Sequence, residues 1–96
     1  MKNQIDKVIT KSIDEINEFL IDDEKVKISS KTILFGDQSP LDSLKFFNLI
    51  LNIEKNLSEE FNTEIILSDS DEEMYNGKNF YNIDSLRKFI IMKIKN

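Results

Sequence analysis

The stretch DSLKFFNLILNIEKNL, residues 42–57, decides the fold because its apolar residues recur with the period of an α-helix. The helical pattern begins at Ser43 and continues to about Phe61. At 100° per residue, one face should turn towards a core. The residues on that face are Phe46, Leu49, Ile50, Ile53 and Leu57.

The same helix carries a second apolar strip, formed by Leu44, Phe47 and Leu51, which lies beside Ser43 at the helix start. A helix that is apolar on more than one face is either deeply buried or uses the extra face for another purpose. The residues alone leave both interpretations open.

Two further segments have helical periodicity, one at each end of the chain. The apolar stripe of the first contains Ile5, Val8, Ile9, Ile13, Ile16, Phe19 and Leu20. The stripe of the last, which Asn82 can cap, contains Ile83, Leu86, Phe89, Ile90 and Ile94.

Two connections complete the expected organisation. Residues 21–42 show no clear helical period, but Ile33-Leu34-Phe35 predicts that this long first loop is ordered and contacts the core. The acidic run from Ser68 to Glu73 suits the amino terminus of a short helix. It lacks the turn glycine and terminal glutamate of a calcium loop.

Composition points to one globular, helical domain over residues 1–96, with 40% hydrophobic and 32% charged residues. Two glycines and one proline are too few for a turn-rich β fold. The absence of cysteine and histidine argues against disulfides and zinc, and we expect no metal site. We expect neither a signal peptide nor a membrane-spanning segment, and hence a cytoplasmic protein. We also expect a monomer.

The net charge of −5 disfavours nucleic acid as a partner and favours basic proteins. A helix-turn-helix DNA-binding protein is excluded because no basic recognition helix is present. A nucleophilic serine needs a base, and no histidine is available. A lysine could serve instead, but we expect no Ser-x-x-Lys motif at Ser43 or at Ser85. We therefore expect no catalytic residue and no enzyme activity.

The tripeptide Asp-Ser-Leu occurs twice, at Ser43 and at Ser85. Ser43 opens the long helix directly after a loop, where unpaired N–H groups favour negative charge and a serine can carry a phosphate ester. The alternative is that Ser43 is simply the N-cap. Ser85 lies in the first turn of the last helix, without an accompanying apolar strip, and is best interpreted as structural.

Three segments in order resemble an acyl carrier protein over nearly the whole chain. They are Leu34-Phe35-Gly36, Pro40-Leu41-Asp42-Ser43-Leu44 and Glu59-Glu60-Phe61-Asn62-Thr63-Glu64-Ile65. The resemblance implies a four-helix bundle of three longer helices and one short helix. It also implies 4′-phosphopantetheine on Ser43, within the attachment motif of Asp42 and Leu44, transferred from coenzyme A by a magnesium-dependent phosphopantetheinyl transferase.

The thiol of that arm would carry acyl groups as thioesters between acyl-loading and acyl-processing enzymes. The resemblance implies a partner surface on the second helix, at Leu44, Phe47, Leu51 and Glu54. We further predict that the core-facing residues of this helix border a deformable acyl pocket, formed by Phe46, Ile50, Ile53 and Leu57.

The chain departs from housekeeping fatty-acid-synthesis carriers in its second helix. This helix carries Lys45, Asn48, Asn52 and Lys55 and is longer by about one turn. The departure favours a specialised carrier, with acidic contacts shifted towards Asp42, Glu54, Glu59, Glu60 and residues 69–73. An aminoacyl, D-alanyl or peptidyl carrier, and an unmodified helical interaction module, remain alternatives.

Overall fold

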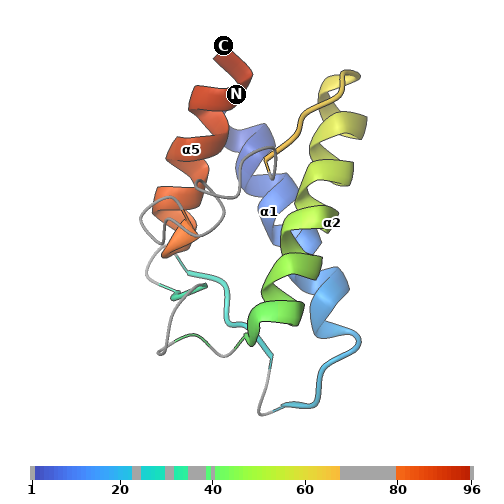
Figure 1. Ribbon diagram of the computed structural model, residues 1–96, viewed down its shortest axis with the longest axis vertical. Coiled ribbons are helices and arrows are strands. Elements are labelled where there is room, and N and C mark those ends of the chain that lie inside the picture. The colour runs from blue at the N-terminus through green and yellow to red at the C-terminus, as the bar shows by residue number, and fades with distance from the viewer. Residues whose placement is uncertain are drawn as a thin grey trace.

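The computed structural model has an all-α architecture in which three helices surround a common core (Figure 1). It describes residues 2–22, 25–29, 32–34, 39, 41–67 and 80–95, apart from the side chain of Ser43. Within these residues the helices are α1 (Lys2–Asn17), α2 (Ser43–Phe61) and α5 (Ile83–Lys95). The same residues contain no β-strand, only an isolated antiparallel bridge between Ile33 and Asn82.

Helix α1 runs antiparallel to α2 and α5 and packs against both (Figure 1). The carboxyl end of α1 therefore lies at the same end of the molecule as the amino ends of the other two helices. Asp42 and Ser43, at the start of α2, lie at this end of the molecule. The expected short helix at residues 68–73 lies outside the described residues.

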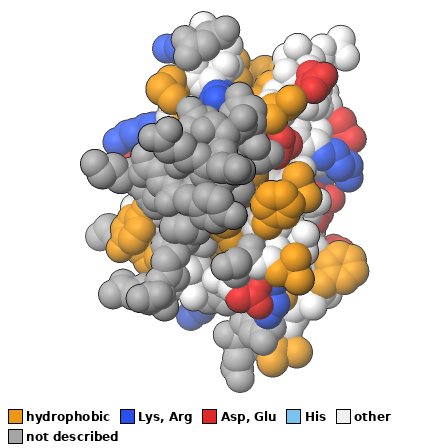
Figure 2. Space-filling view, viewed as in Figure 1, with side chains coloured by type: hydrophobic (Ala, Val, Ile, Leu, Met, Phe, Trp, Pro, Cys, Tyr) orange, Lys and Arg blue, Asp and Glu red, His pale blue; other side chains and the backbone are white. Residues whose placement is uncertain are grey.

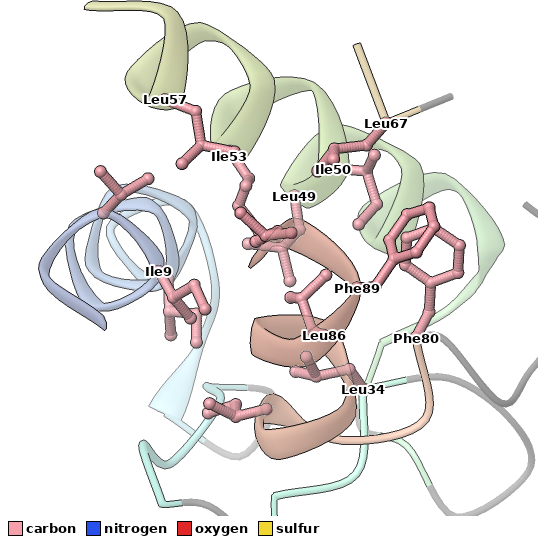
Figure 3. Packing of buried hydrophobic residues seen from close by; sticks show 14 of the residues in the cluster. Ile9, Leu34, Leu49, Ile50, Ile53, Leu57, Leu67, Phe80, Leu86 and Phe89 are labelled. Carbon is pink, nitrogen blue, oxygen red and sulfur yellow. The ribbon is translucent and has the colours of Figure 1, made fainter. Parts of the chain in front are cut away.

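The core fills the space between the three helices (Figure 3). The predicted inward face of α2 is confirmed, because Phe46, Leu49, Ile50, Ile53 and Leu57 are all at most 4% exposed. Phe80 precedes α5 and meets Phe46 and Phe89 edge-on, with ring centroids 5.7 and 5.2 Å apart. Edge-on contacts of this kind add to the stabilisation from burial alone.

The predicted bounds of α2 are also confirmed. The helix ends where Asn62 adopts the left-handed conformation, with φ 52° and ψ 41°, and its N–H donates to the Ser58 carbonyl. Asparagine tolerates this conformation better than most residues. The Ser58 hydroxyl then accepts from the Ile65 N–H at 3.1 Å and fixes the chain as it leaves the helix.

Helix α1 ends earlier than its apolar stripe predicts. The α-helix stops at Asn17, whose side chain forms two hydrogen bonds with the backbone of Val26, at 2.8 and 2.9 Å. A tighter turn follows, in which the Phe19 N–H donates to the Ile16 carbonyl. The expectation that Phe19 faces the core is therefore wrong: its side chain is 88% exposed, whereas Leu20 is partly buried against the core.

The long first loop contacts the core where the sequence analysis predicted. Leu34 is fully buried, and its N–H donates to the Tyr81 carbonyl at 2.7 Å. Val26 and Leu41, from the same connection, are also buried. Phe35, the third residue of the predicted contact, lies outside the described residues.

Polar contacts join α1 to both of its neighbours. The Asn56 amide on α2 donates to the Ser12 hydroxyl at 2.8 Å and to the Glu15 carboxylate at 2.7 Å. The Arg87 guanidinium on α5 donates to the Asp6 carboxylate on α1. These contacts help to fix how the helices sit against each other. In the part of the chain that the structure describes, no helix has the length and apolarity to cross a membrane.

Candidate functional site

The amino terminus of α2 is capped by Asp42. This residue is extended, with φ −77° and ψ 176°, and its Oδ1 accepts from the Lys45 N–H at 2.8 Å. The Asp42 carbonyl accepts from the Phe46 N–H at 2.9 Å, which is the first hydrogen bond of the helix. Asp42 therefore has the N-cap role that was the structural alternative for Ser43.

Ser43 is the first residue within α2, directly after the cap. Because the Asp42 carboxylate already accepts from the third N–H of the helix, capping does not require the Ser43 hydroxyl. The amino terminus of a helix favours a negatively charged group. The Ser43 side chain itself lies outside the described residues, so its predicted role stays a prediction.

The second apolar strip of α2 is exposed, which resolves the two interpretations that the sequence left open. Leu44 is 70% exposed, and Phe47 and Leu51 are each 43% exposed. Figure 2 shows hydrophobic side chains gathered on the face over the amino-terminal half of α2 and the end of α1. Burial does not explain this strip, so it is available for contacts outside the core.

A groove of about 450 Å³ adjoins the strip, between the end of α1 and the first half of α2. We call it the α1–α2 groove. Its α1 side is apolar and consists of Ile16, Phe19 and Leu20. Its α2 side is mostly polar and consists of Lys45, Asn48, Leu51 and Asn52.

The second Asp-Ser-Leu copy has a different environment. The Ser85 hydroxyl accepts from the Asn82 N–H at 3.0 Å, while the Asn82 side chain accepts from the Ser85 N–H at 2.8 Å. This reciprocal pair is a capping box for α5, and it confirms the predicted cap at Asn82. Leu86, which follows the serine, is fully buried. The structural interpretation of this copy is therefore confirmed.

The expectation that Ser85 has no Ser-x-x-Lys motif is wrong, because Lys88 follows this serine at that spacing, which can serve nucleophilic catalysis. Here the Lys88 ammonium pairs with the Asp84 carboxylate at 3.2 Å. The Ser85 hydroxyl donates to the Asn82 carbonyl at 3.0 Å. The Ser85 hydroxyl and the Lys88 ammonium therefore both contact residues at the start of α5. In this structure the two residues belong to the cap of that helix.

The residues predicted to border an acyl pocket lie together in the core. Phe46 is 4% exposed, and Ile50, Ile53 and Leu57 are all 0% exposed. Figure 3 shows Ile50, Ile53 and Leu57 among the packed side chains between the helices. A cargo chain would reach them only if the core opened, and the pocket stays a prediction.

The acidic residues expected to contact partners lie along and beyond α2. Asp42 is exposed at its start, Glu54 is half-buried on α2, and Glu59 is exposed near its end. Glu60 is half-buried. The expected acidic run at residues 69–73 lies outside the described residues.

Sequence reasoning missed two features of the packing between α1 and α2. One is the α1–α2 groove, which depends on how two distant segments pack. The other is the buried contact of Ser12 with Asn56, whose Oδ1 is buried without a partner among the described residues. The contact between Ser12 and Asn56 could have been found from the sequence. Each is a polar residue at a position that helical spacing places on the apolar face of its helix.

Comparisons of the chain with protein-family models, with curated proteins and with solved structures give no match. The functional assignment therefore depends on the residues of the chain and on the geometry of the α2 amino terminus.

Proposed function

We propose that the chain is an acyl carrier protein with 4′-phosphopantetheine on Ser43. The observation that carries this proposal is the contrast between the two Asp-Ser-Leu copies. At Ser85 the hydroxyl belongs to a capping box and the next leucine is buried. At Ser43 a neighbouring carboxylate provides the cap and the next leucine is 70% exposed.

The residues around Ser43 fit the prosthetic group. Attachment would join the serine oxygen to the phosphorus of the pantetheine arm, break the pyrophosphate of coenzyme A and release adenosine 3′,5′-bisphosphate, with the serine proton passing to a base of the transferase. The phosphodiester would lie at the positive end of the α2 dipole. Exposed Asp42 and Leu44 would be accessible to the transferase.

The arm supplies a thiol that forms thioesters with acyl groups, which is chemistry that this cysteine-free chain lacks. The chain's own residues bind and orient partners. The exposed strip of Leu44, Phe47 and Leu51 lies within two and a half turns of Ser43, so an enzyme docked there would have the arm within reach. Glu54 extends this surface with negative charge.

The proposal includes a short fourth helix, a monomeric cytoplasmic protein and a specialised pathway. The partners would be a phosphopantetheinyl transferase and acyl-loading and acyl-processing enzymes. The second helix of housekeeping carriers is acidic, whereas α2 here has basic and neutral polar residues at Lys45, Asn48 and Asn52. This difference in charge supports recognition by partner enzymes of a specialised pathway. Aminoacyl, D-alanyl or peptidyl cargo remains the alternative within this class, and loading assays with candidate ligases separate the cargoes.

The test is intact-mass measurement after incubation with coenzyme A, Mg²⁺ and a promiscuous phosphopantetheinyl transferase. The wild-type chain and the Ser85→Ala variant should each gain one phosphopantetheine, and Ser43→Ala should gain none. Equal gains in wild type and Ser43→Ala would assign the modification to another residue and refute the proposal.

One observation favours a second function, an unmodified protein-interaction module. The exposed strip of Leu44, Phe47 and Leu51 would suit a partner helix even without a prosthetic group. The same mass experiment separates the two functions, because a chain that never gains mass but still binds a partner through this strip is an interaction module.

A further inference from the structure

The exposed strip on α2 and the α1–α2 groove form one continuous surface. Leu51 belongs to both, because it is part of the strip and also lines the groove. Leu44 lies two turns earlier on the same side of α2, and Phe19 lies across the groove, past the carboxyl end of α1. All three side chains are exposed, and Phe19 is 88% exposed. We call the groove and these three residues the docking face, because so much apolar surface on one side of a molecule marks a site for a partner (Figure 2).

The α1 edge of the docking face is acidic. Asp14 and Glu18 are exposed one turn apart on α1, and Glu15 lies beside them, three residues before Glu18. In the part of the chain that the structure describes, neither Asp14 nor Glu18 forms an ion pair. Lys7 and Lys11 lie nearer the amino end of α1, outside the length of the groove. A partner lying along the groove would therefore be favoured by basic side chains over this edge.

The α2 edge has the opposite charge. Lys55 is exposed and follows Leu51 by one turn on the same face of the helix. The Lys45 ammonium, nearer the helix start, lies 3.9 Å from Asp42 Oδ2, so its charge is already partly balanced. Acidic side chains on the partner would complement Lys55.

The spacing of the apolar residues suits one helix of a partner. Leu44 and Leu51 are seven residues apart, so a helix with apolar residues at the same spacing could contact both, with Phe19 on its other side. Asn48 and Asn52 also line the groove. A covered amide needs a hydrogen-bonding partner, so the apolar stripe of the bound helix should include a polar side chain such as glutamine.

We propose that the docking face binds one amphipathic helix of a partner protein, with its basic edge over Asp14 and Glu18 and its acidic edge over Lys55. Given the carrier function proposed above, this partner is an enzyme that acts on the arm, and the inference rests on that function for the partner's role. The contact extends the partner surface from α2 to the end of α1. Phe19 becomes its largest apolar contribution, in the manner of an aromatic hot spot.

The test is fluorescence anisotropy of labelled helical peptides of roughly 18 residues, titrated with the unmodified chain. The first peptide has leucines at heptad spacing with one glutamine among them, lysines along one edge and glutamates along the other. The second has the same stripe with glutamates along both edges.

Two pairs of variants locate the binding. Phe19→Ser removes the aromatic contact, and Met92→Ser, at a side chain 48% exposed on α5, is its matched control. Glu18→Lys reverses a charge on the α1 edge, and Glu64→Lys, at an exposed residue beyond the end of α2, makes the same change of charge elsewhere.

Phe19→Ser should weaken binding of the first peptide at least about tenfold, because burying a phenylalanine side chain contributes more than the free energy of a factor of ten. Met92→Ser should leave the affinity within about twofold. Glu18→Lys should weaken binding of the first peptide and strengthen that of the second, each about threefold or more, whereas Glu64→Lys should change both by less than about twofold.

Equal losses in Phe19→Ser and Met92→Ser, or no binding of either peptide, would overturn the proposal. Tighter binding of the second peptide than of the first by the wild-type chain would overturn the assignment of charge. A dimer of the chain that sedimentation detects and that Phe19→Ser abolishes would overturn the proposal too, because the occupant would then be a second copy.

The peptides are tested on the chain without a prosthetic group, so this result is independent of the test of the carrier function. A phosphopantetheine gain in the mass experiment without peptide binding keeps the carrier function and refutes the docking face. Phe19-dependent binding without a phosphopantetheine gain refutes the carrier function and leaves the docking face as that of an interaction module.

Discussion

Replacing the leucine of each Asp-Ser-Leu copy by alanine should give two very different losses of stability. Leu86 is 0% exposed and belongs to the core, so Leu86→Ala leaves a cavity and should cost about 3 kcal/mol. Leu44 is 70% exposed, so Leu44→Ala removes few packing contacts and should cost about 0.5 kcal/mol or less. The sixfold difference follows from burial, since the two tripeptides are identical.

The assay is urea and thermal unfolding of the unmodified proteins, followed by circular dichroism. Each kcal/mol corresponds to roughly 4–8 °C in a domain of this size, so Leu86→Ala should melt about 12 °C or more below wild type. Leu44→Ala should melt within about 4 °C of wild type. Equal losses in the two variants would refute the assignment of the first copy to an exposed surface and the second to the core.

Two further substitutions test the contacts around α2. Asp42→Ala removes the N-cap and should cost about 1 kcal/mol in urea unfolding, whereas Asp42→Asn should cost less because asparagine caps equally well; a loss as large for asparagine would contradict the cap. Asn56→Asp places a buried carboxylate beside that of Glu15 and should cost at least about 2 kcal/mol by the same assay. Asn52→Asp, one turn earlier and half-buried at the groove, is its control and should cost about 0.5 kcal/mol or less, so equal losses would contradict the buried contact.

The helices could be predicted from the sequence because their apolar periods are regular. Ile50, Ile53 and Leu57 follow the spacing of a single helix face, and all three are fully buried. The cap of α5 was predictable for a similar reason, because Asn82 precedes an apolar stripe. Local patterns of this kind need no knowledge of distant contacts.

The end of α1 could not be predicted in this way. Phe19 continues the apolar stripe, but the two hydrogen bonds between Asn17 and Val26 favour a turn before it. Such contacts between distant residues leave no periodic signal. The exposure of Phe19, and with it the α1–α2 groove, therefore became visible only in three dimensions.

The start of α2 at Ser43 was predicted, but the residue that caps it was not. Asp42 and Ser43 are both good capping residues, and local preference does not choose between them. The structure selects Asp42, whose carboxylate accepts from the Lys45 N–H. Because Asp42 caps α2, the Ser43 hydroxyl is not needed as the cap.

The most direct measurement of the central claim is peptide mapping of the wild-type chain after treatment with coenzyme A and the transferase. Trypsin separates the two copies, leaving Ser43 in the peptide of residues 32–45 and Ser85 in that of residues 79–87. The account predicts one phosphopantetheine on the first peptide, with fragment ions assigning it to Ser43 rather than Ser39. A modified second peptide, or an unmodified first peptide, would contradict it.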